Sequence, residues 1–234
     1  MKSTSDSPAF EVFDWQALGP EPVIGVDEVG RGCLAGPVYA AAAIVPRDQV
    51  AALLQMGVTD SKLLSSTKRE KLAIEIRARC HVALGFATAE EIDEINILQA
   101  SFLAMRRALI GLDDQWVSAG IGARFGPTTA HFLVDGHMKI PMLRSPVACS
   151  HWSDVPQTTL IKGDLRALPI AAASIVAKVT RDQWMTEAAL EYPGYGFEKH
   201  KGYAAPIHRK AIEEQGPTRI HRKTFGGVRE FLGR

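Results

Sequence analysis

Residues 23–38 read VIGVDEVGRGCLAGPV, an apolar strand-like run that ends in two adjacent carboxylates and a glycine-flanked arginine. Asp27 and Glu28 repel each other and would lose hydration on burial, so a plain core strand has no use for them. A second apolar run covers residues 38–45, and glycines and a proline separate the two runs. We therefore expect two neighbouring antiparallel strands, with the acids near the end of the first.

The rest of the chain continues this pattern of strands and helices. We predict strands over 81–87, 131–134 and 158–161, and helices from 66 or 67 to 79, from 88 to about 111, from 169 to 191 and from 206 to 215. Ser66 or Thr67 is the expected N-cap of the first helix, and Glu70 is placed to complete a capping box. This order indicates an α/β fold with a central mixed β-sheet, flanking helices and a helical C-terminal portion. We expect a loosely ordered lead-in over 1–20 and a single domain over 21–234.

Composition places the chain among ordinary globular proteins. Its 234 residues have a formal net charge of +1 and are 46% hydrophobic. Residues 191–234 contain nine lysines and arginines against five acids. This is a mild hint of phosphate contact, although a solvated helical face is the more ordinary explanation. The three cysteines form no CxxC pair, which favours a reducing compartment. The longest apolar run, 38–45, is too short to span a bilayer, so we expect a cytoplasmic protein without a membrane segment.

Apolar strands that lead into acids recur further along the chain. The strand over 131–134 is followed by Asp135, and the strand over 158–161 is followed by Lys162, Gly163 and Asp164. Strand ends in an α/β sheet are where ligand sites gather. Four acids at one edge need cations, and hard divalent ions such as Mg²⁺ or Mn²⁺ prefer carboxylate oxygens. Two such ions about 3.5–4 Å apart suit in-line displacement at a phosphodiester.

The pair of adjacent acids leaves a geometric question open. Successive strand residues point to opposite faces, so Asp27 and Glu28 do not project together from a regular strand. Either the following glycines twist the chain, or Glu28 reaches the ions from another direction. Gly30, Arg31 and Gly32 form a turn whose N–H groups can face a phosphate or sugar, although an ordinary turn has the same pattern.

Eight motifs follow one another along the chain: IGVDEVGRG (24–32), DSKLLS (60–65), EIDEINIL (91–98), LVDG (133–136), KGD (162–164), AAASIVAKVTRD (171–182), YGFEKHKGY (195–203) and HRKTFG (221–226). As an ordered set they resemble the bacterial ribonuclease HII family from about residue 23 onward. The resemblance implies a ribonuclease-H-like fold and metal-dependent endonucleolytic cleavage of RNA in RNA–DNA hybrids. It also implies cleavage 5′ of single ribonucleotides embedded in duplex DNA, leaving a 3′-hydroxyl and a 5′-phosphate, and a role in removing ribonucleotides from DNA.

The same resemblance assigns roles to individual residues. It implies that the metal ligands are Asp27, Glu28, Asp135 and Asp164, with Asp182 as a rival for the fourth place. It assigns substrate reading to Gly30, Arg31, Gly32 and Tyr203, because only a 2′-hydroxyl distinguishes a ribonucleotide from its DNA neighbours. Phosphate contacts are expected from Lys62, Ser174, Lys178 and Arg181. Lys178 and Arg181 lie three apart on a helix and share a face, which a solvated helix surface also explains.

Several positions depart from the family pattern. Cys33 stands where the family usually has proline, and His137 stands where asparagine is common. Residues 120–129 and 144–157 look like surface insertions. The expected absence of an N-terminal platform domain disfavours the related ribonuclease HIII. We expect a monomer, and find no convincing clamp-binding peptide near the C-terminus that would support recruitment by a replication clamp.

Two other functions share part of this pattern. Another two-metal nuclease or strand transferase, such as a junction resolvase, would need the acids but not the GRG turn and Tyr203. A non-catalytic binder would gain nothing from clustering negative charge beside phosphates. Cleavage of a duplex with one ribonucleotide, with the all-DNA duplex left intact, separates these functions.

Overall fold

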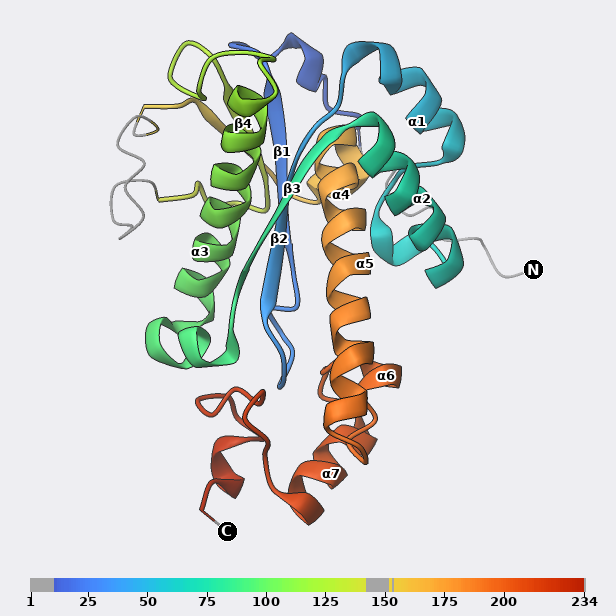
Figure 1. The fold of residues 1–234 in the computed structure, drawn as a ribbon, viewed down its shortest axis with the longest axis vertical. Helices are drawn as coiled ribbons and strands as arrows, with labels where there is room; N and C mark the ends of the chain where they lie inside the picture. The colour runs from blue at the N-terminus through green and yellow to red at the C-terminus, as the bar shows by residue number, and fades with distance from the viewer. Residues whose placement is uncertain (1–10, 142–151, 153, 234) are drawn as a thin grey trace, which may run out of the picture.

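The computed structural model describes residues 11–141, 152 and 154–233 and is built around a five-stranded sheet (Figure 1). The strands are β1 (Val23–Val29), β2 (Val38–Ile44), β3 (His81–Ala87), β4 (His131–Asp135) and β5 (Gln157–Leu160), in the order β3-β2-β1-β4-β5. β1 pairs antiparallel with β2, and β2 with β3, whereas β1–β4 and β4–β5 are parallel. The predicted mixed sheet is therefore confirmed, and its parallel half brings three strand ends to one edge.

Helices cover both faces of the sheet. The helices of the described residues are α1 (Val50–Met56), α2 (Ser66–Arg79), α3 (Ala89–Ser118), α4 (Gly163–Arg166), α5 (Leu168–Glu191), α6 (Phe197–His200) and α7 (Pro206–Gln215). α3 lies on one face and packs on β2 and β3, whereas α5 lies on the other face against β1 and β2 (Figure 1). α6 and α7 continue from the far end of α5, beyond the sheet.

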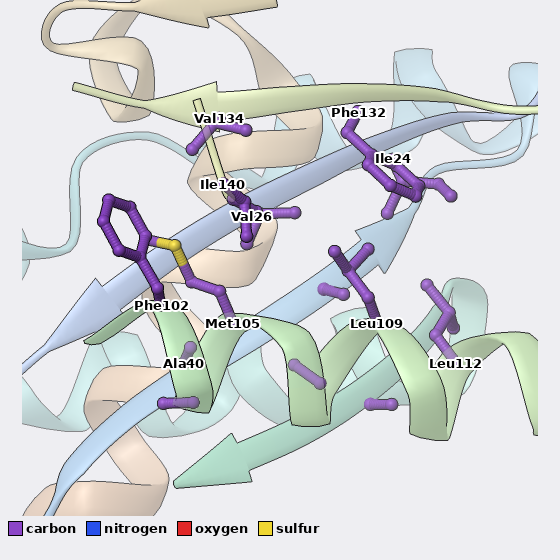
Figure 2. Packing of buried hydrophobic residues seen from close by; sticks show 14 of the residues in the cluster. Ile24, Val26, Ala40, Phe102, Met105, Leu109, Leu112, Phe132, Val134 and Ile140 are labelled. Carbon is purple, nitrogen blue, oxygen red and sulfur yellow. The ribbon is translucent and has the colours of Figure 1, made fainter. Parts of the chain in front are cut away.

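The larger hydrophobic core fills the space between the sheet and α3. Ile24 and Val26 of β1, and Phe132 and Val134 of β4, point into it, where they meet α3 side chains that include Phe102, Met105, Leu109 and Leu112 (Figure 2). Because side chains alternate along a strand, Gly25 and Asp27 face the opposite layer, toward α5. A Cβ at Gly25 would lie 2.2 Å from the Pro169 carbonyl carbon, so only glycine lets α5 start this close to β1.

Most predicted elements agree with the structure to within two residues, and the differences have local causes. α3 runs seven residues past the predicted end because Leu112 and Trp116 continue to pack on the core. The predicted cap at Ser66 or Thr67 with Glu70 is wrong: Ser65 is the N-cap of α2 and accepts from the Lys68 N–H. The sequence does not predict short elements such as α1, α4 and α6, because one or two helical turns leave little periodicity to detect.

Two regions expected to be peripheral contact the domain. Phe13, Trp15 and Leu18 pack on a small cluster that contains Val23 and Leu133, and the Phe13 N–H donates to the Arg166 carbonyl at 2.9 Å. The described part of the lead-in, residues 11–20, therefore lies against the sheet. Residues 120–129 form the loop between α3 and β4. The expected insertion over 144–157 falls largely outside the described residues.

α3 is long and apolar enough to cross a membrane by length and composition alone. However, 56% of its most apolar window is buried inside the protein, and its contacts are with the sheet. We therefore interpret α3 as the core helix of a globular domain.

Candidate active site

Three predicted acids meet at the carboxyl end of the parallel strands. Val26 pairs with Val134, so Asp27 and Asp135 follow side by side, and Asp135 is level with Leu160 of β5. Asp164 lies four residues beyond Leu160, in the first turn of α4. Val26 and Val134 both face α3, which places Asp27 and Asp135 on the α5 side of the sheet. The fold thus gathers acids from three separate segments, as their positions at strand ends predict.

Each of these acids is held by neighbouring groups. Asp27 hydrogen-bonds the Ser174 side chain of α5, and its Oδ1 accepts from the Glu28 N–H at 2.7 Å. Asp135 Oδ1 accepts from the Gly163 N–H at 2.7 Å. Asp164 Oδ2 lies 3.3 Å from Nζ of Lys62, whose side chain is 77% exposed. The carboxylates are therefore oriented before any ligand binds.

The electrostatics of the site show that the acids act on one another. Burial raises the pKa of Asp27 well above its usual value, and the charges of Glu28, Asp135 and Asp164 raise it further. The pKa of Asp164 is raised by burial and then by the nearby Asp60, while Lys62 lowers it. Burial also raises the pKa of Asp135, and backbone N–H groups at the start of α4 oppose that shift. The site carries more negative charge than its own cations offset, which is the setting that attracts an external cation.

Glu28 takes a different direction from Asp27. It pairs with Ala40, a residue of the α3-facing core, so its side chain leaves β1 on the side opposite Asp27. Glu28 Oε1 lies 3.1 Å from Nη1 of Arg31, and this guanidinium opposes the rise in the pKa of Glu28 that burial causes. Glu28 nevertheless raises the pKa of Asp27. β1 therefore stays regular through both acids, and the following glycines do not twist Glu28 onto the face of Asp27.

The carboxylates have the ligand chemistry that a hard divalent cation prefers, but they do not form a complete coordination site. Among the described residues, no three His, Cys, Asp or Glu side chains are close enough together to hold a metal ion. Asp27, Asp135 and Asp164 each accept a hydrogen bond from an internal donor. Four oxygen ligands that repel one another nevertheless match Mg²⁺ or Mn²⁺.

The GRG turn (Gly30, Arg31, Gly32) directly follows the acids. Gly30 has a φ of +94°, and a Cβ there would lie 2.1 Å from Nε of Arg181, so both backbone and packing require glycine. On its inner side the turn is held by Arg222, which donates to the carbonyls of Gly30 and Arg31 at 2.7 and 2.8 Å. A Cβ at Gly32 would meet nothing within 4 Å, so the outer side of the turn is open.

Tyr203 and Lys178 line a groove of about 910 Å³ between α2, α5 and α6. Tyr203 is 42% exposed, and Lys178 Nζ lies 5.7 Å from the centre of its ring. Lys199 and Lys201 also line this groove. Asp182 belongs to the groove wall, where it binds Lys178 Nζ at 2.7 Å. Asp182 therefore pairs with a lysine of the groove, whereas Asp164 lies near Asp60 and Asp135.

Two of the predicted phosphate contacts need correction. Arg181 is fully buried, and its guanidinium donates to the carbonyls of Pro37, Lys201 and Ala35 at 2.9, 2.9 and 3.1 Å, so it joins loops instead of meeting a phosphate. Ser174 is buried too and bonds Asp27 and Ser61, so it orients an acid. Lys62 is exposed beside Asp164, Lys178 lines the groove, and His137 is exposed two residues beyond Asp135.

Sequence reasoning assigned no role to three groups that support the site. Asp60 accepts from the Lys62 N–H at 2.8 Å and faces Asp164. Arg222 and the pair His208 and His221 are fully buried beneath the GRG turn and Tyr203. The motif HRKTFG contains two of these residues, but a charged or polar side chain in a loop gives no sign that it will be buried.

The chain matches known proteins over most of its length. The family model for ribonuclease HII matches residues 24–228. A ribonuclease HII of Rhizorhabdus wittichii is 44% identical over 219 residues, which cover 94% of this chain and 95% of that protein. The solved PCNA:RNase HII complex from Archaeoglobus fulgidus is similar with a TM-score of 0.63 at 25% identity, covering 87% of this chain and 95% of that one.

A more distant structure agrees in fold. Bst-RNase HIII in complex with Mn²⁺ matches with a TM-score of 0.70 at 20% identity, over 93% of this chain and 71% of that one. Since the family model spans the sheet, the acids and the C-terminal loops together, the chain belongs to the ribonuclease HII family, whose members are endoribonucleases that cleave RNA in RNA–DNA hybrids.

Proposed function

We propose that this protein is a metal-dependent endoribonuclease that cuts RNA in RNA–DNA hybrids and also cuts 5′ of single ribonucleotides embedded in duplex DNA. The products would carry a 3′-hydroxyl and a 5′-phosphate, and the biological role would be removal of ribonucleotides from DNA. The observation that supports this proposal is the meeting of Asp27, Asp135 and Asp164 at one sheet edge, directly beside the GRG turn.

Asp27, Glu28, Asp135 and Asp164 would hold the divalent ions, Mg²⁺ or Mn²⁺, with two ions present when substrate is bound. Such ions, when bound, supply Lewis-acid stabilisation of the charge that develops at the phosphodiester. The protein's own contribution is orientation. Ser174 fixes Asp27 and the Gly163 N–H fixes Asp135, while Lys62 offsets charge at Asp164 and is exposed enough to contact a phosphate.

The GRG turn and Tyr203 would read the sugar. The backbone of the turn faces open space on its outer side, so its N–H groups can bind a 2′-hydroxyl, the one group that DNA lacks. The half-exposed ring of Tyr203 can pack on the neighbouring sugar. Lys178, Lys199 and Lys201 line the same groove and would meet the phosphates on that side.

Three labelled duplexes test the proposal directly: all-DNA, DNA with one ribonucleotide, and an RNA–DNA hybrid. With Mg²⁺ or Mn²⁺ we expect cleavage of the second and third and none of the first. Excess EDTA should abolish cleavage, and added metal should restore it. Cleavage of all-DNA duplex would instead favour a general two-metal nuclease, and chelator-resistant cleavage would refute the metal dependence.

Two substitutions at Tyr203 test the reading role. Tyr203→Ala should lower cleavage at a single embedded ribonucleotide about tenfold or more, because the ring that positions the sugar is lost. Tyr203→Phe keeps the ring and is the matched control, with a rate expected within about twofold of the wild type. Equal rates in all three proteins would remove Tyr203 from substrate reading.

We further propose that the protein acts in the cytoplasm as a monomer. The complex with PCNA is a property of the A. fulgidus relative. For this chain we propose nucleic acid as the partner.

A further inference from the structure

Residues 218–222, here called the bridge segment, lie between the two elements that read the substrate. The Gly36 N–H donates to the Ile220 carbonyl at 2.8 Å, and the Arg222 N–H donates to the Leu34 carbonyl at 2.9 Å. A β-bridge joins Ala35 and His221 between these bonds. The bridge segment is therefore fixed to the chain that leaves the GRG turn.

Arg222 connects the bridge segment to the GRG turn itself. Its side chain is fully buried, and it donates to the carbonyls of Gly36 (3.0 and 2.9 Å), Arg31 (2.8 Å) and Gly30 (2.7 Å). Burial lowers the pKa of Arg222 to about 10, which still leaves the guanidinium charged near neutral pH. Burying a cation against carbonyls costs free energy. The acceptors of Arg222 are carbonyls of the GRG turn and of Gly36, just before β2 begins.

His221 connects the bridge segment to Tyr203 through His208. His221 Nδ1 accepts from the Thr218 N–H at 2.9 Å, so in the neutral ring Nε2 carries the proton. His208 Nδ1 lies 2.8 Å from the Tyr203 carbonyl, which only accepts, so His208 Nδ1 carries its proton and Nε2 accepts. The two Nε2 atoms are 3.0 Å apart. The contacts thus define one directed chain, from Thr218 through His221 and His208 to the backbone of Tyr203.

We propose that His221 and Arg222 are positioning residues that set where Tyr203 stands relative to the GRG turn, and thereby set the preference for a single embedded ribonucleotide. This inference rests on the proposed function. Arg222 binds the GRG turn directly, and the adjacent His221 reaches Tyr203 through His208. A shift of either contact would therefore change the gap into which the ribose fits. Arg181 reinforces the junction because it donates to the carbonyls of both Ala35 and Lys201.

Two substitutions of His221 separate this role from simple packing. In His221→Gln the amide nitrogen takes about the place of Nε2 and can still donate to His208. In His221→Asn the side chain can accept from Thr218 but is too short to reach His208. The quantity to measure is the ratio of kcat/KM for the single-ribonucleotide duplex to kcat/KM for the RNA–DNA hybrid. We expect His221→Asn to lower this ratio about tenfold and His221→Gln to keep it within about twofold.

Arg222→Lys tests the other contact, with Arg219→Lys as its control. Arg219 lies in the same segment, but its side chain is 72% exposed and pairs with Glu191. We expect the ratio to fall about tenfold in Arg222→Lys, because an ammonium cannot reach three separate carbonyls, and to stay unchanged in Arg219→Lys. Far-ultraviolet circular dichroism verifies that each variant is folded. If Arg222→Lys does not fold, the positioning role is tested by the two His221 variants.

The outcomes distinguish a failure of the positioning role from a failure of the proposed function. Wild-type protein that leaves the single-ribonucleotide duplex intact would refute the proposed function itself. Wild-type protein that cuts it, together with equal ratios in His221→Asn and His221→Gln, would overturn the positioning role alone. A structural role without positioning would lower the melting temperature and slow cleavage of both substrates in proportion, leaving the ratio constant.

Discussion

Asp27 is the residue at which stability and function conflict most directly. It is buried beside three other acids, and both burial and repulsion raise its pKa well above the usual value. The folded state therefore holds the proton more tightly than the unfolded chain. Ionised Asp27 destabilises the folded state. This destabilisation is absent when the pH is below the unfolded pKa of 3.8, and it is complete when the pH is above the raised pKa of the folded state.

Replacing Asp27 with asparagine should therefore stabilise the metal-free protein while it removes activity. Near neutral pH and in EDTA, we expect Asp27→Asn to raise the melting temperature by a few degrees, with the gain shrinking as the pH approaches 4. Turnover should fall at least about 10²–10³-fold, because charge stabilisation in the transition state is lost.

Thermal unfolding of Asp27→Asn and the wild type, followed across this pH range, measures the effect. Asp48→Asn removes an exposed acid and is the control. A melting temperature that falls in Asp27→Asn, or near-normal turnover, would contradict the interpretation of Asp27.

At the residue scale, the sequence predicts the position of the acidic residues better than the role of the basic ones. A carboxylate that follows an apolar strand indicates a strand end whatever the rest of the fold is, and Asp27, Asp135 and Asp164 do come together. Arg181 could not be interpreted in this way. Its three acceptors belong to residues 35, 37 and 201, which come together only in the folded chain, so helical spacing gave no sign of its burial.

At the scale of elements, the parallel arrangement of β1, β4 and β5 builds the site. β-propensity and strand-end acids predict the strands, and their pairing follows from the crossover connections. Less of the helical layer could be predicted. Asn96 has a φ of +66° inside α3, and its side chain accepts from the N–H groups of Leu98 and Gln99, so it restarts the helix after a kink. That role depends on the backbone geometry at Asn96, and the continuous helical pattern of the sequence gives no sign of it.

The GRG turn provides an element-scale prediction with a built-in control. Gly30→Ala would force a side chain into a φ of +94° and against Arg181, whereas Gly32→Ala would meet open space. We expect Gly30→Ala to lower the free energy of unfolding by about 1–3 kcal/mol and Gly32→Ala to change it by less than about 1 kcal/mol. Urea unfolding of both variants measures the difference. Equal stabilities would show that the turn does not need the conformation described above.

At the scale of the whole molecule, the C-terminal portion is joined to the GRG turn. Asp27 and Glu28 come from β1, and the GRG turn follows that strand, whereas Tyr203 comes from beyond α6. The bridge segment contacts the GRG turn directly and Tyr203 through His208. The sequence predicts this portion as helices packed against the sheet, but α6 and α7 lie beyond the sheet and pack at the far end of α5. Its function as a support could not be predicted, because it depends on polar contacts between residues more than 180 positions apart.

The buried histidines of this junction predict how stability depends on pH. Burial lowers the pKa of His208 from 6.5 to about 4 and that of His221 to about 3, with His200 and Arg209 adding to the effect on His208. A lowered folded pKa means that the unfolded state takes up protons first, so this contribution is complete above pH 6.5 and is lost as the pH falls toward 4. For His208 alone the difference corresponds to about 3 kcal/mol.

Chemical unfolding between these pH values measures the loss. The acids near Asp27 respond in the opposite direction, so the informative quantity is the difference in slope between wild type and variant. His208→Gln should flatten the pH dependence of the unfolding free energy, and His137→Gln, an exposed control, should leave it unchanged. Identical slopes in all three proteins would show that the histidine pair is not held neutral.

The central claim is that acids from three strand ends form one cation site beside the GRG turn, and one pair of variants tests it most directly. The measurement is the cleavage rate of the single-ribonucleotide duplex as a function of Mg²⁺ concentration in Asp164→Asn and Asp182→Asn. We predict that Asp164→Asn loses at least about 100-fold in maximal rate and needs more Mg²⁺, while Asp182→Asn stays within a few-fold of wild type. A wild-type response in Asp164→Asn, with the loss in Asp182→Asn instead, would contradict the account.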